Sequence, residues 1–169
     1  PPDAQKTIAG DRRKAKAHPG KVHIAAGGSG IAPDMAVQLF QLMTGVDMVH
    51  VPYRGQGPAM TDLIGGQVQI LFAAAPGTAD YVKTGKLRAL AVTTTARMPE
   101  LPDVPTVADS VPGYEASQWY GFAAPKSTPA EIVDKLNKEI NTAIADPGMK
   151  AKLAALGGDP IPGSPADFG

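Results

Sequence analysis

Four consecutive residues between an apolar run and a helical pattern have the composition of an anion-binding turn. Gly27, Gly28, Ser29 and Gly30 follow the β-rich run 22–26 and lead directly into apolar residues at helical spacing. Such a turn exposes main-chain N–H groups at a helix N-terminus, where the helix dipole also favours a carboxylate or phosphate. We therefore predict that Gly28, Ser29, Gly30 and Ile31 contact a small organic anion. A plain strand-to-helix turn that needs glycine for its positive φ is the alternative.

The turn departs from the common phosphate-binding signatures. It is not a P-loop, because no Lys-Ser or Lys-Thr pair follows the glycines. It is not a G-x-G-x-x-G turn either, because Pro33 stands where the third small residue belongs.

A second candidate lies after the apolar run 68–74. In an open parallel sheet, ligands bind beyond the carboxyl ends of the strands, where the strand order reverses. If the first and third strands flank that point, Ala73, Ala74, Ala75 and Pro76 face the glycine turn, and their small side chains let a ligand approach the main chain. An empty connection is an equally good interpretation of these residues. Tyr53 and Arg54, after the second strand, are weaker candidates for pairing with a carboxylate.

No arrangement of residues in the sequence indicates catalysis or a metal site. His18, His23 and His50 are not spaced as metal ligands or as a catalytic dyad, so we interpret them as structural. Ser29 lies in GGSGI and not in G-x-S-x-G, and no paired carboxylates stand out. We expect no enzyme activity, no metal and no cofactor.

The pattern around these candidates predicts an α/β fold with a mainly parallel sheet and flanking helices. Strands are expected at 22–26, 46–53, 68–74, 87–93 and 114–124, and the first four alternate with helices, as right-handed crossovers require. A basic helix is expected over 4–17, and Gly57 and Pro58 should begin a short helix ended by Gly65. Thr128, Pro129 and Glu131 match a capping box, Asp146 and Pro147 begin another helix, and Ser164 to Asp167 look like the start of one more.

Composition limits the class of partner. The 169 residues are about one ordinary domain, and 16 basic residues balance 16 acidic ones, so net charge gives no reason to expect a nucleic acid or a membrane surface. There is no cysteine, which excludes disulfides and thiolate sites. No apolar run reaches the roughly 18 residues of a membrane span, and the N-terminal residues lack the apolar region of a secretory signal, so any export signal would have stood upstream.

Three stretches, 20–74, 85–109 and 113–140, resemble the Bug-type solute-binding proteins of tripartite tricarboxylate transporters. The segments VHVPYRG (49–55), GKLRALAV (85–92) and RMPELPDVPTV (97–107) carry the resemblance most specifically. It implies a type II periplasmic-binding-protein-like fold, a periplasmic location, a small organic acid as ligand and a membrane permease as partner. Such proteins are two-lobed receptors and not enzymes.

The resemblance also implies an incomplete receptor, since family members are close to twice this length. Residues 1–20 would be a partial helix from the first lobe or hinge, 21–112 the ligand-binding second lobe, and 113–169 a return strand and helices that pack on the first lobe. A lone lobe offers half a cleft, so we expect weak affinity. A truncated or vestigial lobe that folds without binding ligand is the alternative.

Three positions depart from the family at the predicted site. The family commonly has a hydroxyl residue at Ile31, a histidine at Asp34 and a polar or acidic residue at Ala73. Loss of the hydroxyl removes a donor to a carboxylate, and Asp34 adds negative charge in the first helical turn. These departures weaken the expectation that the ligand is a carboxylate.

Overall fold

The structure is a computed structural model that describes residues 7–27, 30–75 and 77–168. It divides into two compact units, one ending at Gln118 and the other beginning at Trp119. We call them unit 1 and unit 2 and describe each by itself. The boundary lies six residues beyond the expected one between 112 and 113.

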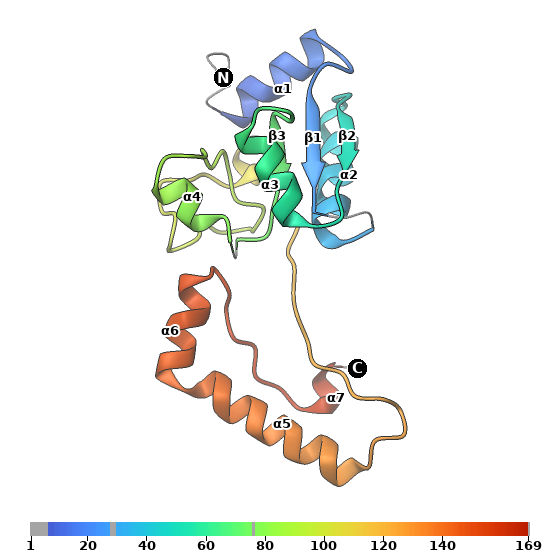
Figure 1. The fold of residues 1–169 in the computed structure, drawn as a ribbon, viewed down its shortest axis with the longest axis vertical. Coiled ribbons are helices and arrows are strands. Elements are labelled where there is room, and N and C mark those ends of the chain that lie inside the picture. Colours follow the sequence, from blue (N-terminus) through green and yellow to red (C-terminus); the bar gives the residue numbers. More distant parts are fainter. Residues whose placement is uncertain (1–6, 28–29, 76, 169) are drawn as a thin grey trace. The chain divides into compact units, whose positions relative to one another are not determined.

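Unit 1 is built on three parallel strands in the order β2-β1-β3. In Figure 1 they lie side by side and point the same way. In register, Ala25 of β1 lies opposite Val51 of β2 and Leu71 of β3. The strands are β1 (His23–Ala26), β2 (Val49–Pro52) and β3 (Ile70–Phe72). The predicted parallel sheet is therefore confirmed for these strands, although each is shorter than its apolar run.

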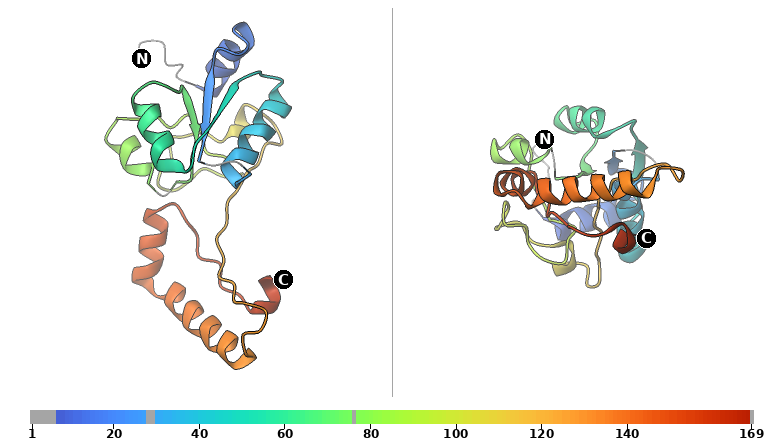
Figure 2. Two further views of the ribbon diagram at one scale, coloured as in Figure 1. Left: turned by 45° about the vertical axis from the view of Figure 1, so that its right-hand side comes forward. Right: turned by 90° about the horizontal axis from the view of Figure 1, so that it is seen from below.

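Helices cover both faces of this sheet (Figure 2). Alternate residues of a strand point to opposite faces. Ile24 and Ala26 pack in one apolar cluster with α2, and Ala25 packs in the other with α3. The helices of unit 1 are α1 (Ile8–Ala17), α2 (Ala32–Thr44), α3 (Gln56–Ile64) and α4 (Ala79–Lys83). Since β1 is buried on both faces, its continuous apolar pattern is that of a central parallel strand.

A later segment completes the α2 face of the core. The 3₁₀-helix η1 (Val107–Asp109) begins with a capping box in which Thr106 and Asp109 bind each other's main-chain N–H groups. Tyr114 is buried, and its hydroxyl donates to the Ala36 carbonyl at 2.9 Å. Phe40 packs edge-to-face against the Tyr114 ring. Tyr114 therefore belongs to the core of unit 1.

Two predicted strands do not form. Residues 87–93 contain a single parallel bridge, between Val92 and Thr106, and residues 114–124 are irregular. A strand exists by repeated pairing, and beyond that bridge the two runs share a single described main-chain hydrogen bond, from the Ala116 N–H to the Thr93 carbonyl. The side chains of Trp119, Tyr120 and Phe122 are 69–79% exposed, so the apolar pattern that predicted a strand is not matched by burial.

The first helical residues also differ from two predictions. Helix α3 begins at Gln56 with Gly55 as its N-cap, so Gly57 and Pro58 lie inside its first turn. In unit 2, α5 (Ala130–Ala145) has Pro129 as N-cap with no side-chain cap, and the capping box expected from Thr128 and Glu131 is not formed. The Pro129 carbonyl instead accepts from the N–H groups of Ile132 and Val133.

Unit 2 consists of helices with little packing among them. The expected helix after Asp146 is confirmed as α6 (Pro147–Ala155), with the Asp146 carboxylate accepting from Met149 N–H, and Ser164 precedes a short α7 (Pro165–Phe168). Asn137 and Asn141 of α5 donate to the Gly163 carbonyl, which ties the segment before α7 to α5. Within 119–168, no residue is buried. Of the helices described, none is both long and apolar enough to cross a membrane.

Candidate functional site

The described parts of the connections after β1 and β3 lie at the same edge of the sheet, since the two strands are parallel neighbours. The chain runs from β1 through α2 to β2 on one side, and then through α3 back across β1 to β3 on the other. Strand order therefore reverses between β1 and β3, and this is where an open parallel sheet binds ligands. We call the two connections, residues 27–31 and 73–77, the switch point. The sequence analysis required that the first and third strands flank the point where the strand order reverses, and β1 and β3 meet this condition.

The structure describes part of the predicted site. Gly30, Ile31, Ala73, Ala74 and Ala75 are described, and the three alanines are half-buried. Gly28, Ser29 and Pro76 lie outside the described residues. Gly30 has φ 75°, a conformation that favours glycine. Ile31 is the N-cap of α2 and is 43% exposed, with no side-chain cap hydrogen bond, as expected for a residue without a hydroxyl.

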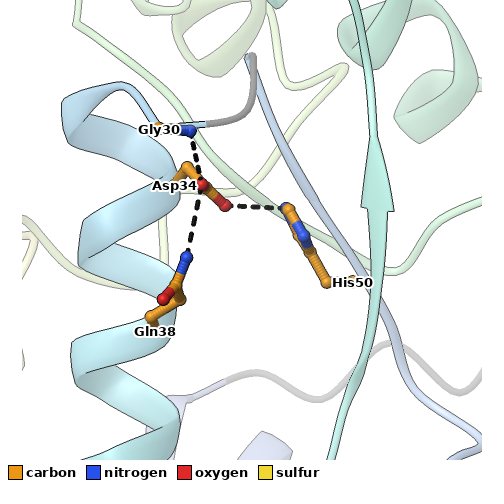
Figure 3. A network of polar contacts seen from close by, with 4 residues as sticks. All are labelled: Gly30, Asp34, Gln38 and His50. Carbon is orange, nitrogen blue, oxygen red and sulfur yellow. Dashed lines mark hydrogen bonds and ion pairs between the residues drawn. The ribbon is translucent and has the colours of Figure 1, made fainter.

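Asp34 accepts a hydrogen bond from a main-chain N–H group that we predicted, from the sequence, to contact the ligand. Its Oδ2 accepts from Gly30 N–H at 2.7 Å and from Gln38 Nε2 at 3.3 Å (Figure 3). Asp34 is the third residue of α2, so this contact is half of a capping box displaced by one residue. The side chain is buried, with Asp34 only 4% exposed. The Asp34 carboxyl group is therefore buried beside Gly30 and is not exposed at the protein surface.

His50 of β2 faces the same carboxylate, although the sequence pattern gave it no partner. Its Nε2 lies 3.2 Å from Asp34 Oδ1, within ion-pair distance when the imidazole is protonated. The arrangement is not that of a hydrogen bond, and neither atom has such a partner among the described residues. Pairing of β1 with β2 could have suggested this contact, because Asp34 follows β1 and His50 lies on the neighbouring strand.

The connection after β3 is held by side chains from two helices. The Gln56 amide at the start of α3 exchanges two hydrogen bonds with the Ala74 main chain, accepting from its N–H at 3.1 Å and donating to its carbonyl at 3.2 Å. The Thr78 hydroxyl, just before α4, lies within hydrogen-bond distance of the carbonyls of Ala74 and Ala75. Sequence reasoning missed Gln56, because a single glutamine between two glycines gives no periodic or motif signal.

The two weaker candidates, Tyr53 and Arg54, lie in different environments. Tyr53 donates its hydroxyl to Asp62 Oδ2 of α3 at 2.7 Å, and this hydrogen bond to a carboxylate raises the tyrosine pKa. Arg54 is exposed. The structure does not bring either side chain into a hydrogen bond with the described residues of the switch point.

Within the described part of the chain, no three histidine, aspartate or glutamate side chains are grouped as a metal site would require. Among the described residues, the polar groups at this edge include main-chain amides and carbonyls, the buried Asp34 carboxylate with His50 beside it, the Gln56 amide and the Thr78 hydroxyl. Such groups fix the orientation of a small polar ligand.

Several curated relatives match most of this chain, which spans less than half of their own length. A UPF0065 protein from the tcbD-tcbE intergenic region of Pseudomonas sp. (strain P51) is 39% identical over 155 residues, covering 90% of this chain and 46% of the relative. A shorter relative, a UPF0065 protein from the clcB-clcD intergenic region of Pseudomonas knackmussii, is 35% identical over 132 residues. There the match covers 77% of this chain and 78% of the relative.

Solved structures show the same fold with ligands in two cases. R. palustris Rpa4515 with adipate has a TM-score of 0.94 and 34% identity, over 97% of this chain and 55% of that one. MatC (Rpa3494) from Rhodopseudomonas palustris with bound malate has a TM-score of 0.79 and 29% identity, over 90% and 52% of the two chains. The periplasmic binding protein BugD has a TM-score of 0.81 and 34% identity, over 90% and 52%.

The family profile gives the same assignment over nearly the whole sequence. The profile described as "Tripartite tricarboxylate transporter family receptor" matches residues 2–168. The parallel sheet with flanking helices agrees with the solved relatives, and the match to about half of each agrees with one lobe of such a fold. This chain belongs to the tripartite tricarboxylate transporter receptor family, whose solved members include periplasmic binding proteins.

Proposed function

We propose that this chain is the ligand-binding part of a periplasmic receptor that captures a small organic carboxylate at the switch point. The observation that carries the proposal is the strand order β2-β1-β3, which brings the connections after β1 and β3 to one edge of the sheet. Two ligand-bearing relatives, one with adipate and one with malate, support a carboxylate as the ligand class.

Main-chain N–H groups would attract the carboxylate of the ligand. With Gly30 N–H bound to Asp34 and Ala74 N–H bound to Gln56, the donors left for a guest include the N–H groups of Ile31 and Ala32 at the start of α2. Neither of these two has a hydrogen-bond partner among the described residues. The α2 dipole adds a partial positive charge at the same place.

We infer the wider role from the family assignment. The bound acid would be passed to a membrane permease of the tripartite tricarboxylate type, with this chain acting as a receptor and not as an enzyme. Balanced charge agrees with a small ligand rather than with nucleic acid or direct membrane insertion.

Unit 2 would belong to the other half of a complete receptor. Its longest helix, α5, exposes nearly half of Ile132 and of Leu136. In water, such an apolar stripe favours packing against another surface. We propose that residues 119–169 pack on a first lobe in a receptor of full length.

Calorimetric titration of the chain with a panel of small acids tests the ligand class. Malate, adipate, aspartate and an aromatic acid should be compared, with the adipate-binding relative Rpa4515 as positive control. We expect at least one dicarboxylate to bind, with a dissociation constant of the order of 1 mM, because half a cleft supplies few contacts. A relative that responds to adipate while this chain responds to no acid would contradict the proposal.

A lobe that folds without binding ligand is the second candidate. The observation that favours it is the internal pairing of Gly30 N–H with Asp34 and of Ala74 N–H with Gln56, since both amides are satisfied without a guest. If this candidate is right, no acid of the panel gives a heat of binding, and removal of the Asp34 charge does not produce binding.

A further inference from the structure

Gln56 touches both connections of the switch point. Its side-chain amide is paired with the Ala74 main chain on the β3 side. On the β1 side, its main chain lies so close to Gly27 that a Cβ on that glycine would stand 3.3 Å from Gln56 N. A Cβ on Gly77 would stand 3.7 Å from Gln56 Nε2. One residue therefore bridges the segments that follow two different strands.

The Gln56–Ala74 pair imitates the pairing of a strand. A primary amide presents one acceptor and one donor, and the two hydrogen bonds to Ala74 are those that a neighbouring main chain would make. β3 ends at Phe72, so the pair holds the main chain two residues beyond the last strand residue. Without it, Ala73 to Ala75 would keep Thr78 as their remaining described hydrogen-bond partner.

We propose that Gln56 is the positioning residue of the switch point, which fixes the Ala73–Ala75 main chain in the conformation that the ligand requires. This inference rests on the proposed carboxylate-binding function and adds a residue to it. Gln56 acts through Ala74 and needs no contact with the ligand. Preorganisation of this kind raises affinity, because less of the binding free energy goes into ordering the loop.

The matched control is a second glutamine with the same kind of contact at the other end of the sheet. Gln41 of α2 accepts from Met48 N–H at 3.0 Å, immediately before β2 begins. Gln41→Ala therefore removes a glutamine-to-main-chain hydrogen bond without touching the switch point. Both substitutions should lower the unfolding midpoint, and Gln56→Ala should lower it further because it removes two hydrogen bonds where Gln41→Ala removes one.

Hydrogen exchange of the Ala74 amide reports the positioning itself, with no ligand present. We expect Gln56→Ala to raise the exchange rate of that amide about tenfold and Gln41→Ala to leave it unchanged. Gln56→Glu gives a rescue. Its carboxylate can still accept from the Ala74 N–H, although it has no proton to donate to the Ala74 carbonyl, so the Ala74 amide should exchange more slowly in Gln56→Glu than in Gln56→Ala. An Ala74 exchange rate that is the same in the parent chain and in Gln56→Ala would overturn the inference.

Ligand affinity is the second measurement, with adipate and malate as probes. We expect Gln56→Ala to weaken binding about tenfold and Gln41→Ala to leave it within twofold of the parent chain. Unchanged binding by Gln56→Ala would overturn the positioning role while leaving the proposed function intact. If the parent chain binds neither probe nor any other acid of the panel, the proposed function fails, and the positioning role fails with it.

Discussion

At the residue scale, Asp34 changes what the glycine turn can offer. A turn with free N–H groups attracts anions, but here the Gly30 N–H is bound at 2.7 Å by a buried carboxylate of the same chain. A ligand carboxylate would also meet the negative charge of Asp34, partly offset by His50 when that side chain is protonated. The affinity of this chain for organic acids should therefore depend strongly on one residue outside the predicted contact set.

Asp34→Asn should strengthen the binding of malate and adipate by about three- to tenfold. The introduced amide oxygen can still accept from Gly30 N–H, while the charge that opposes the ligand is gone. Asp47→Asn removes the same charge from an exposed position before β2 and serves as the control in calorimetry. An equal effect of the two substitutions would contradict a local role for Asp34.

Tyr114→Phe should lower the free energy of unfolding by about 1 kcal/mol at neutral pH, because the buried hydroxyl loses its hydrogen bond to the Ala36 carbonyl. Burial also raises the pKa of Tyr114 to about 12, above the value of about 10 in an unfolded chain. The contribution of the protonated phenol is therefore complete below pH 10 and is lost as the pH rises towards 12.

Denaturant unfolding at pH 9 and pH 12 checks this sign. Between pH 9 and pH 12, the free energy of unfolding of the parent chain should fall by about 2 kcal/mol more than that of Tyr114→Phe, since about 1.4 kcal/mol corresponds to one pKa unit. An equal fall in the free energy of unfolding of both proteins would mean that Tyr114 ionises as readily in the folded state as in the unfolded state.

At the element scale, sequence patterns predicted most of the elements that have local signals, although not the cap of α5, and they failed for two strands that depend on a pairing partner. The three strands β1 to β3 and the helix start at Asp146 have local signals, and all are present. The runs 87–93 and 114–124 carry equally good strand patterns, but a strand needs a neighbour, and pattern does not supply one.

The same distinction applies to the candidate site. Glycine and small residues indicated the two connections, and the parallel order confirmed that β1 and β3 are neighbours. The contacts of Asp34 with His50 and of Gln56 with Ala74 join residues 16 and 18 positions apart on different elements. Such contacts have no periodicity, so they become predictable only once the pairing of the strands is known.

Gly27→Ala should destabilise unit 1, because the new Cβ would stand 3.3 Å from the main chain at the start of α3. That contact requires α3 to shift by a few tenths of an ångström, and we expect a cost of about 1–2 kcal/mol in the free energy of unfolding. Gly57→Ala is the control, since a Cβ there meets open space inside a helix and should stabilise by about 0.5–1 kcal/mol. Chemical denaturation compares the two, and a stabilised Gly27→Ala would contradict the close approach.

At the scale of the whole molecule, the two units differ in what holds them together. Unit 1 has buried residues on both faces of its sheet, whereas within 119–168 no residue is buried. Helices that bury no apolar face are marginal in water. Stability of the chain should therefore come from unit 1.

A fragment of residues 1–118 should unfold cooperatively within a few degrees of the whole chain. A fragment of residues 119–169 should show weak helical signal and no cooperative transition, because its apolar side chains have too little to pack against. Circular dichroism during heating measures both. A sharp transition in the second fragment would contradict this division of stability.

The measurement that tests the central claim most directly is a titration of the ¹⁵N-labelled chain with malate and adipate, followed by the amide chemical shifts. If the switch point binds carboxylates, the largest shifts should fall at Ile31 and Ala32 after β1 and at Ala73 to Ala75 after β3, and they should saturate by about 10 mM ligand. Saturating shifts confined to other residues, or none at these five while the adipate-binding relative responds, would contradict the account.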